Sequence, residues 1–176
     1  MLSLRIGTLN CRTLRTDARL VELECGLNTI PFDIIGLSEV KRQGRHSVTL
    51  QQSRHCLFHS GQVGFLVNKR WTSNSTFRAI TSRVAILDVQ TPAGTVRMVQ
   101  AYGPTSTSSD EEYENFLASV NEGLNYRQVR RVRLPGNVGF SNSLLETLMP
   151  KLEVEKTTRY SSGNTALVIT TKEVTC

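Results

Sequence analysis

Two apolar runs near the start of the chain predict β-strands, and the segment between them predicts a helix. The strands cover residues 4–10 and 32–39. Over residues 18–27 the leucines recur at helical spacing, and Thr16-Asp17 can cap the first turn. Glu22 and Glu24 fall outside this apolar stripe. A strand, a helix and a strand of these lengths are typical of a right-handed crossover between parallel strands.

After Gly44 the pattern changes to short runs of β-type residues. They predict strands at residues 48–50, 56–58, 63–67, 77–80, 83–90 and 95–102. The turn sequence Thr91-Pro92-Ala93-Gly94 separates the last two, so residues 83–102 are expected to form a β-hairpin.

A second helix is predicted over residues 111–124, after the capping sequence Ser108-Ser109-Asp110. Its acidic start suits the positive end of the helix dipole, and its expected buried stripe is Tyr113, Phe116, Leu117 and Val120. We therefore interpret residues 3–125 as one α/β domain.

Residues 126–176 are less regular, and we interpret them as a divergent tail with little fixed order. Weak patterns favour strands at 129–134 and 166–170 and a short helix at 144–148. The densest basic run of the chain also lies here, at Arg127, Arg130, Arg131 and Arg133. It is either an exposed arm or a replaced segment.

Composition favours a globular intracellular protein, nuclear or cytoplasmic, that does not enter a membrane. The 176 residues are 39% apolar, and no run approaches the ~20 apolar residues of a membrane span. Arginines interrupt the first thirty residues, so no signal peptide is expected. The four cysteines are scattered without metal-binding or disulfide spacing.

An excess of basic residues gives the chain a formal net charge of +6. Such a charge favours a polyanionic partner such as DNA, because phosphate contacts release counterions. A merely solvated basic surface is an equally good interpretation of the charge taken alone.

Polar side chains end the first two predicted strands. Asn10 ends the first, and Glu39 ends the second. Ligands of open α/β sheets bind outside the carboxyl ends of the strands, where these side chains would meet. A carboxylate beside an amide oxygen suits Mg²⁺, which prefers oxygen ligands.

Five segments, taken together and in this order, resemble the endonuclease/exonuclease/phosphatase superfamily. The nearest forms are the apurinic-type endonuclease domain of non-LTR retrotransposons and the craniofacial-development-protein-like sequences. The segments are GTLNCRTL, FDIIGLSEVKR, GQVGFLVNKRW, SRVAILDV and VQAYGPTS. The resemblance implies a four-layered α/β sandwich, here a partial one, and a Mg²⁺-dependent endonuclease acting on DNA. It also implies metal-site roles for Asn10 and Glu39, and an active-site role for Tyr102.

The family's later motifs are not found in this chain. A GDFN segment, an aspartate near IDY and a terminal Asp-His pair are expected, but the chain has no aspartate after Asp110 and no histidine after His59. The nearest remnant of GDFN is Leu134-Pro135-Gly136-Asn137, without a carboxylate. We therefore expect a missing or altered C-terminal part and impaired catalysis.

The basic residues after Glu39 are candidate nucleic-acid contacts. Lys41, Arg42 and Arg45 would lie at the mouth of the site and could hold phosphates, and Asn137 is a weaker candidate. A solvated charged loop is the alternative. The three histidines, His46, His55 and His59, match no metal motif and are expected at the surface.

Each site residue also has a structural interpretation. Asn10 could cap the loop after its strand, Glu39 could pair with Lys41 or Arg42, and Tyr102 could belong to the core. The function hypotheses are, in order, a DNA endonuclease with impaired activity and a non-catalytic nucleic-acid-binding or vestigial module derived from a retroelement. A phosphatase acting on phosphoinositides or sphingomyelin ranks last.

Overall fold

The computed structural model describes residues 3–43, 46–105 and 107–126, together with the backbone of three strands at 139–140, 156–161 and 164–171. Two helices are α1 (Asp17–Leu27) and α2 (Asp110–Asn125), and a short 3₁₀ turn covers Thr72–Asn74. Within these residues no helix is both long and apolar enough to cross a membrane.

The described strands form two principal sheets. The first has the order β2-β3-β5-β4, with β2 (Ile6–Asn10) parallel to β3 (Ile34–Arg42) and the other neighbours, β5 (Cys56–Val67) and β4 (Ser47–Thr49), antiparallel. The crossover through α1 therefore has the predicted connectivity. A separate pair joins β1 (Ser3–Leu4) to β9 (Gly139–Phe140).

The second sheet has the order β10-β11-β8-β7-β6. Its centre is the predicted hairpin, β7 (Val84–Thr91) and β8 (Gly94–Tyr102), flanked by β6 (Ser75–Ala79). The strand predicted at 166–170 corresponds to β11 (Asn164–Thr171), which runs parallel to β8 and pairs with β10 (Lys156–Ser161). The elements predicted at 129–134 and 144–148 lie outside the described residues.

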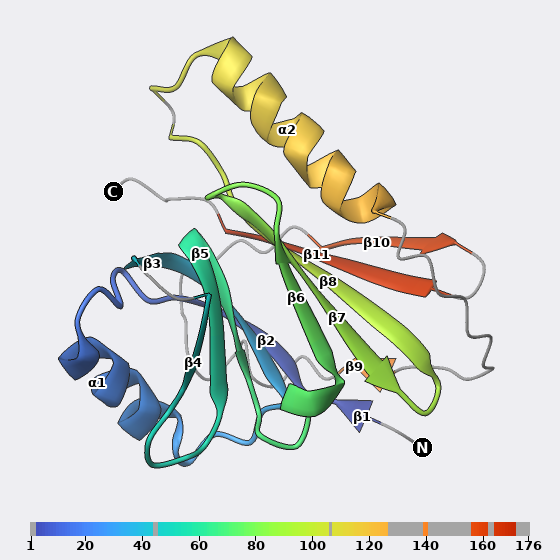
Figure 1. Ribbon diagram of the computed structural model, residues 1–176. Helices are drawn as coiled ribbons and strands as arrows, with labels where there is room; N and C mark the ends of the chain where they lie inside the picture. The colour runs from blue at the N-terminus through green and yellow to red at the C-terminus, as the bar shows by residue number, and fades with distance from the viewer. Residues whose placement is uncertain are drawn as a thin grey trace.

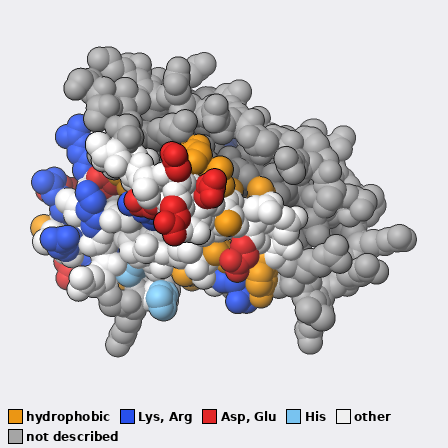
Figure 2. Space-filling view, turned by 90° about the horizontal axis from the view of Figure 1, so that it is seen from above, with side chains coloured by type: hydrophobic (Ala, Val, Ile, Leu, Met, Phe, Trp, Pro, Cys, Tyr) orange, Lys and Arg blue, Asp and Glu red, His pale blue; other side chains and the backbone are white. Residues whose placement is uncertain are grey.

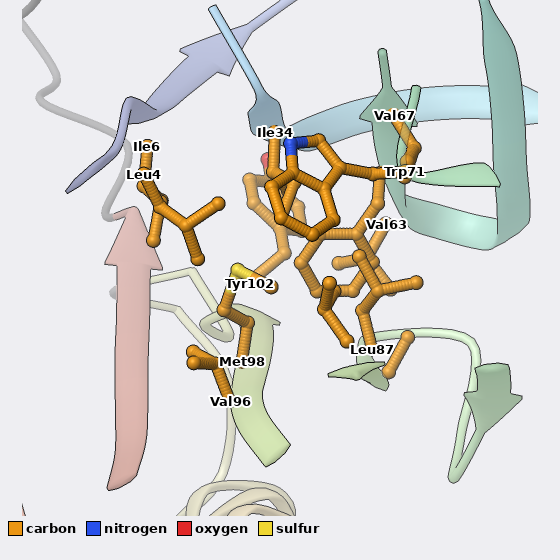
Figure 3. Packing of buried hydrophobic residues seen from close by; sticks show 13 residues of the cluster. Leu4, Ile6, Ile34, Val63, Val67, Trp71, Leu87, Val96, Met98 and Tyr102 are labelled. Carbon is orange, nitrogen blue, oxygen red and sulfur yellow. The ribbon is translucent and has the colours of Figure 1, made fainter. Parts of the chain in front are cut away.

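The two sheets face each other and each carries one helix on its outer side, which gives four layers (Figure 1). The α/β class predicted from the sequence is confirmed. The inter-sheet core draws apolar side chains from both sheets (Figure 3), among them Ile34, Phe65, Leu87 and Met98. A second cluster joins α1 to the first sheet, and a third joins α2 to β7 and β8.

The strand β7 is apolar on both faces because each face meets a different layer. Ala85, Leu87 and Val89 enter the inter-sheet core. Val84 and Ile86 face α2, where an added Cβ on Gly123 would lie 3.6 Å from Ile86. This explains the run of apolar residues that lacks simple alternation.

The structure corrects the predicted stripe of α2. Phe116 and Val120 pack on the second sheet, but Tyr113 and Leu117 are 45% and 47% exposed. Both side chains lie beside the contact, because α2 packs on the sheet through a narrow strip of its surface. The stripe was therefore predicted too wide.

Two polar residues predicted outside the core are buried. Glu24 is 7% exposed because the loop after β4 covers the end of α1, and Glu24 Oε1 accepts a hydrogen bond from the Ser53 backbone N–H at 2.5 Å. His59 is 1% exposed within β5, which forms one long bent strand where two short ones were expected. His46 is exposed and His55 is half-buried.

Gly64 in β5 is expected to tolerate no side chain. A Cβ there would lie 2.5 Å from the backbone oxygen of Phe58, which cannot rotate away. We expect Gly64→Ala to lower the free energy of unfolding by about 1–3 kcal/mol. Gly26→Ala is the matched control, because a Cβ on Gly26 of α1 meets nothing within 4 Å.

Urea denaturation of the two variants measures the difference. Gly26→Ala should raise the free energy of unfolding by about 0.5–1 kcal/mol, since alanine is the better helix former. Equal effects of the two substitutions would contradict the packing described for β5.

Candidate functional site

Three of the predicted site residues converge at one edge of the sandwich, where β2, β3 and β8 end. Asn10 is the last residue of β2, and Tyr102 is the last residue of β8. Glu39 lies near the end of β3, the parallel neighbour of β2. The site is therefore built from strand ends of both sheets.

A bulge in β3 turns Glu39 toward the other two residues. Leu37 and Val40 both pack on the α1 side, although residues three apart face opposite sides of a regular strand. The pairing of β3 with β5 shifts register between Ser38 and Arg42, and Glu39 has a φ of 54°. The bulge thus reverses the alternation and places Glu39 on the face that also carries Asn10 and Tyr102.

Lys41 has the same left-handed conformation, with a φ of 52°. Two such residues around one strand position are strained, because side chains other than that of glycine disfavour this region. Val40, between them, keeps the backbone in this strained conformation. It is fully buried, and its carbonyl accepts a hydrogen bond from the Leu14 backbone N–H at 2.8 Å. The backbone of the site is therefore fixed by the core beneath it.

The Glu39 carboxylate is the centre of the hydrogen-bond network. Its Oε1 accepts from Asn10 Nδ2 at 2.8 Å, and its Oε2 lies 2.8 Å from Lys41 Nζ. Asn10 Oδ1 in turn accepts the Arg12 backbone N–H at 2.9 Å. Asn10 thus caps the loop after its strand, as its structural interpretation expected, and it also contacts Glu39.

Tyr102 belongs both to the core and to the site. It is 7% exposed and packs in the inter-sheet cluster. Its side chain also hydrogen-bonds to Glu39. Arg83 lies above its ring, with the guanidinium carbon 5.6 Å from the ring centroid.

The environment of Glu39 favours its anionic form. Burial raises the pKa of this carboxyl group, but hydrogen bonds from Lys41, Asn10 and Tyr102 and the charge of Lys41 outweigh burial. The pKa therefore lies below its usual 4.5, and Glu39 is ionised at neutral pH. Nearby, burial raises the pKa of the Cys11 thiol to about 12, so that this cysteine stays neutral.

Two polar side chains are buried close to the strand ends that carry the site. Ser38 and Gln100 are fully buried and follow the inter-sheet faces of β3 and β8. Neither side chain has a hydrogen-bond partner within the part of the chain that the structure describes. These groups could serve a polar ligand at this edge.

The side chains at this edge do not form a suitable set of ligands for a resident Mg²⁺ ion. Among the described residues, Glu39 is the carboxylate that contacts Asn10 and Tyr102, and hydrogen-bond donors already occupy both of its oxygens. Another carboxylate on this side, Glu112, pairs with Arg83 at 3.5 Å. The described residues contain no group of three or more histidine, cysteine, aspartate or glutamate side chains that could hold a metal. We therefore assign no metal-dependent step to this edge.

The predicted phosphate-binding residues separate in space. Lys41 lies at the site, but Arg42 points to α1, where its Nη2 is 2.5 Å from Asp17 Oδ1 and its Nη1 donates to the Leu14 carbonyl at 3.1 Å. Arg45 and Asn137 lie outside the described residues, as does the basic run at 127–133.

Basic residues gather on the same face of the molecule (Figure 2). The view from above shows Lys and Arg side chains on the left and acidic side chains beside them. The loop that follows Asn10 contributes the exposed Arg12 and Arg15, and the half-buried Arg83 lies next to Tyr102. Sequence reasoning did not single out these arginines as site residues, because nothing in their spacing relates them to the predicted strand ends.

A cavity of about 260 Å³ opens at the opposite edge of the first sheet. Its lining includes Arg5, Glu24, His55 and Arg70. Burial lowers the pKa of His55, and the charge of Lys69 lowers it further. None of the predicted site residues lines this cavity.

A comparison with solved structures finds the endonuclease domain of TRAS1, a telomere-specific non-LTR retrotransposon. The two chains are 15% identical, the TM-score is 0.44, and the match covers 67% of this chain and 52% of that domain. The chain thus spans about half the length of the domain it matches. No family model and no curated protein matches the sequence.

Proposed function

We propose that this chain binds nucleic acid through its phosphate backbone at the edge formed by Asn10, Glu39 and Tyr102. In this proposal it is related to the Mg²⁺-dependent endonucleases of retrotransposons, and its own phosphodiesterase activity is impaired. The observation that carries the proposal is the convergence of these three residues beside exposed arginines.

The charges at this edge favour binding of a phosphodiester more than they favour its hydrolysis. Lys41 neutralises Glu39, so the site itself does not repel an anion. Arg12 and Arg15 extend from the adjacent loop, where they can contact successive phosphates. Hydrolysis would also need a positioned water and stabilisation of the equatorial phosphoryl oxygens.

Binding to duplex and single-stranded DNA should be weak, without sequence preference, and steeply salt-dependent. Each phosphate neutralised on a duplex contributes about −0.9 to the slope of log K against log salt concentration. We expect Arg12→Ala combined with Arg15→Ala to weaken binding and to make the slope about two units shallower. Fluorescence anisotropy with a labelled duplex over a salt series measures both quantities.

Lys69→Ala is the matched control. Lys69 is exposed, and its neighbour His55 lines the cavity at the opposite edge. This variant should bind nearly as well as the unaltered chain. An affinity that does not change with salt, or an equal loss in both variants, would refute the proposal.

A further inference from the structure

We infer that Lys41 is the built-in cation of this site: it holds the position on Glu39 that a divalent metal ion would take and offers its remaining N–H groups to a phosphate oxygen. The inference deepens the proposed function, and only its second half, the binding of a phosphate oxygen by Lys41, rests on that function. The first half, that Lys41 takes the place of a metal ion on Glu39, can be tested without any nucleic acid.

The contact between Lys41 and Glu39 is buried enough to matter. The Glu39 side chain is 10% exposed and the Lys41 side chain 37% exposed, with 2.8 Å between Nζ and Oε2. Exposed pairs contribute little because water screens them, but here one partner is almost covered. A metal ion would have to displace an ammonium group that the site already holds.

The backbone keeps Lys41 in this position. Its left-handed φ is imposed by the bulge, and Val40 beside it is locked between the core and the Leu14 backbone. Lys41 therefore cannot leave the site by a shift of its strand. Only its side chain can turn away.

The orientation of the Asn10 amide also disfavours a metal ion at Glu39. Its oxygen accepts the Arg12 backbone N–H, so its NH₂ group faces Glu39. A metal ion shared by Glu39 and Asn10 would need the amide oxygen on that side. The three side chains that hydrogen-bond the carboxylate, Lys41, Asn10 and Tyr102, thus all act as donors, which suits an anionic ligand and opposes a second cation.

A lysine ammonium carries three N–H donors. One contacts Glu39 Oε2, and because the Lys41 side chain is 37% exposed, we expect the others to be open to a ligand. A phosphate oxygen bound there completes a charge-assisted hydrogen bond. Phosphate binding would then require no divalent ion.

Mn²⁺ binding followed by electron paramagnetic resonance tests the first half without any nucleic acid. The unaltered chain should bind Mn²⁺ no better than its Glu39→Gln variant. Lys41→Gln should gain affinity of about tenfold or more, because a positive charge within about 4 Å of the ion is removed. Lys41→Arg should keep Mn²⁺ out, and Lys69→Gln, which removes one charge at a distance, should behave like the unaltered chain.

Mn²⁺ binding by the unaltered chain that Glu39→Gln abolishes would overturn the inference, and so would the lack of any gain in a folded Lys41→Gln variant. DNA binding in EDTA tests the second half. It should be at least as tight as binding in Mg²⁺, which competes for the phosphates, and it should fall in Lys41→Gln but not in Lys69→Gln. If the chain bound no DNA at all, the proposed function would fail while the Mn²⁺ result still stood.

Discussion

Incubated with Mg²⁺ and an abasic duplex, this chain is expected to nick DNA about 10²–10⁴-fold more slowly than a complete endonuclease domain of the family it resembles. That range is what a positioned acid or base supplies. The chain has no aspartate after Asp110 and no histidine after His59. His59 itself is buried in β5, where burial lowers its pKa.

We expect that the residues present at the proposed site do not replace the acid or base that the chain lacks. Tyr102 is engaged with Glu39, and Glu39 is engaged with Lys41. Catalytic groups that act as a unit lose most of their effect when one is absent. A gel assay of plasmid or oligonucleotide nicking measures the rate, with Glu39→Gln as the control. Fast nicking that disappears in Glu39→Gln would show that residues elsewhere in the chain complete the site.

Asp33→Ala is expected to lower the free energy of unfolding by about 2–4 kcal/mol, because it leaves buried donors unpaired. Asp33 lies just before β3 and is fully buried. Its Oδ2 accepts the Arg5 backbone N–H at 2.8 Å, and its Oδ1 accepts from Trp71 Nε1 at 2.8 Å and from the Arg70 guanidinium. Removal of the carboxylate would leave these donors without their acceptor.

Urea denaturation measures this loss, and Asp17→Ala provides the comparison. Asp17 also pairs with an arginine, Arg42, but its side chain is 87% exposed. An exposed pair of this kind contributes about 0–1 kcal/mol. Similar losses in the two variants would contradict the role of Asp33 as the buried link between the start of β2, the start of β3 and Trp71.

The elements with strong local signals could be predicted from the sequence. The crossover through α1, the hairpin of β7 and β8 and the capped start of α2 each follow from periodicity and turn residues close together in the chain. The placement of Asn10 and Glu39 at one edge follows from the same reasoning, because parallel neighbours end at the same edge, whereas their contact also requires the bulge in β3.

Features that depend on distant contacts could not be predicted. Glu24 is buried by a loop nearly thirty residues later, and the amphipathic pattern of α1 contains no trace of that loop. The bulge at Glu39 depends on how Val40 packs against α1. Arg83 reaches Tyr102 only because the hairpin brings the two together, with the Tyr102 backbone N–H bonded to the Arg83 carbonyl at 2.9 Å.

The most direct test of the proposed nucleic-acid site is a titration of the ¹⁵N-labelled chain with a short DNA duplex in EDTA, followed by amide chemical shifts. The proposed site predicts the largest shifts in the loop after Asn10, in the bulge from Glu39 to Arg42 and just after Tyr102. Shifts concentrated instead around His55 and Asn68, which line the cavity at the opposite edge, would contradict it.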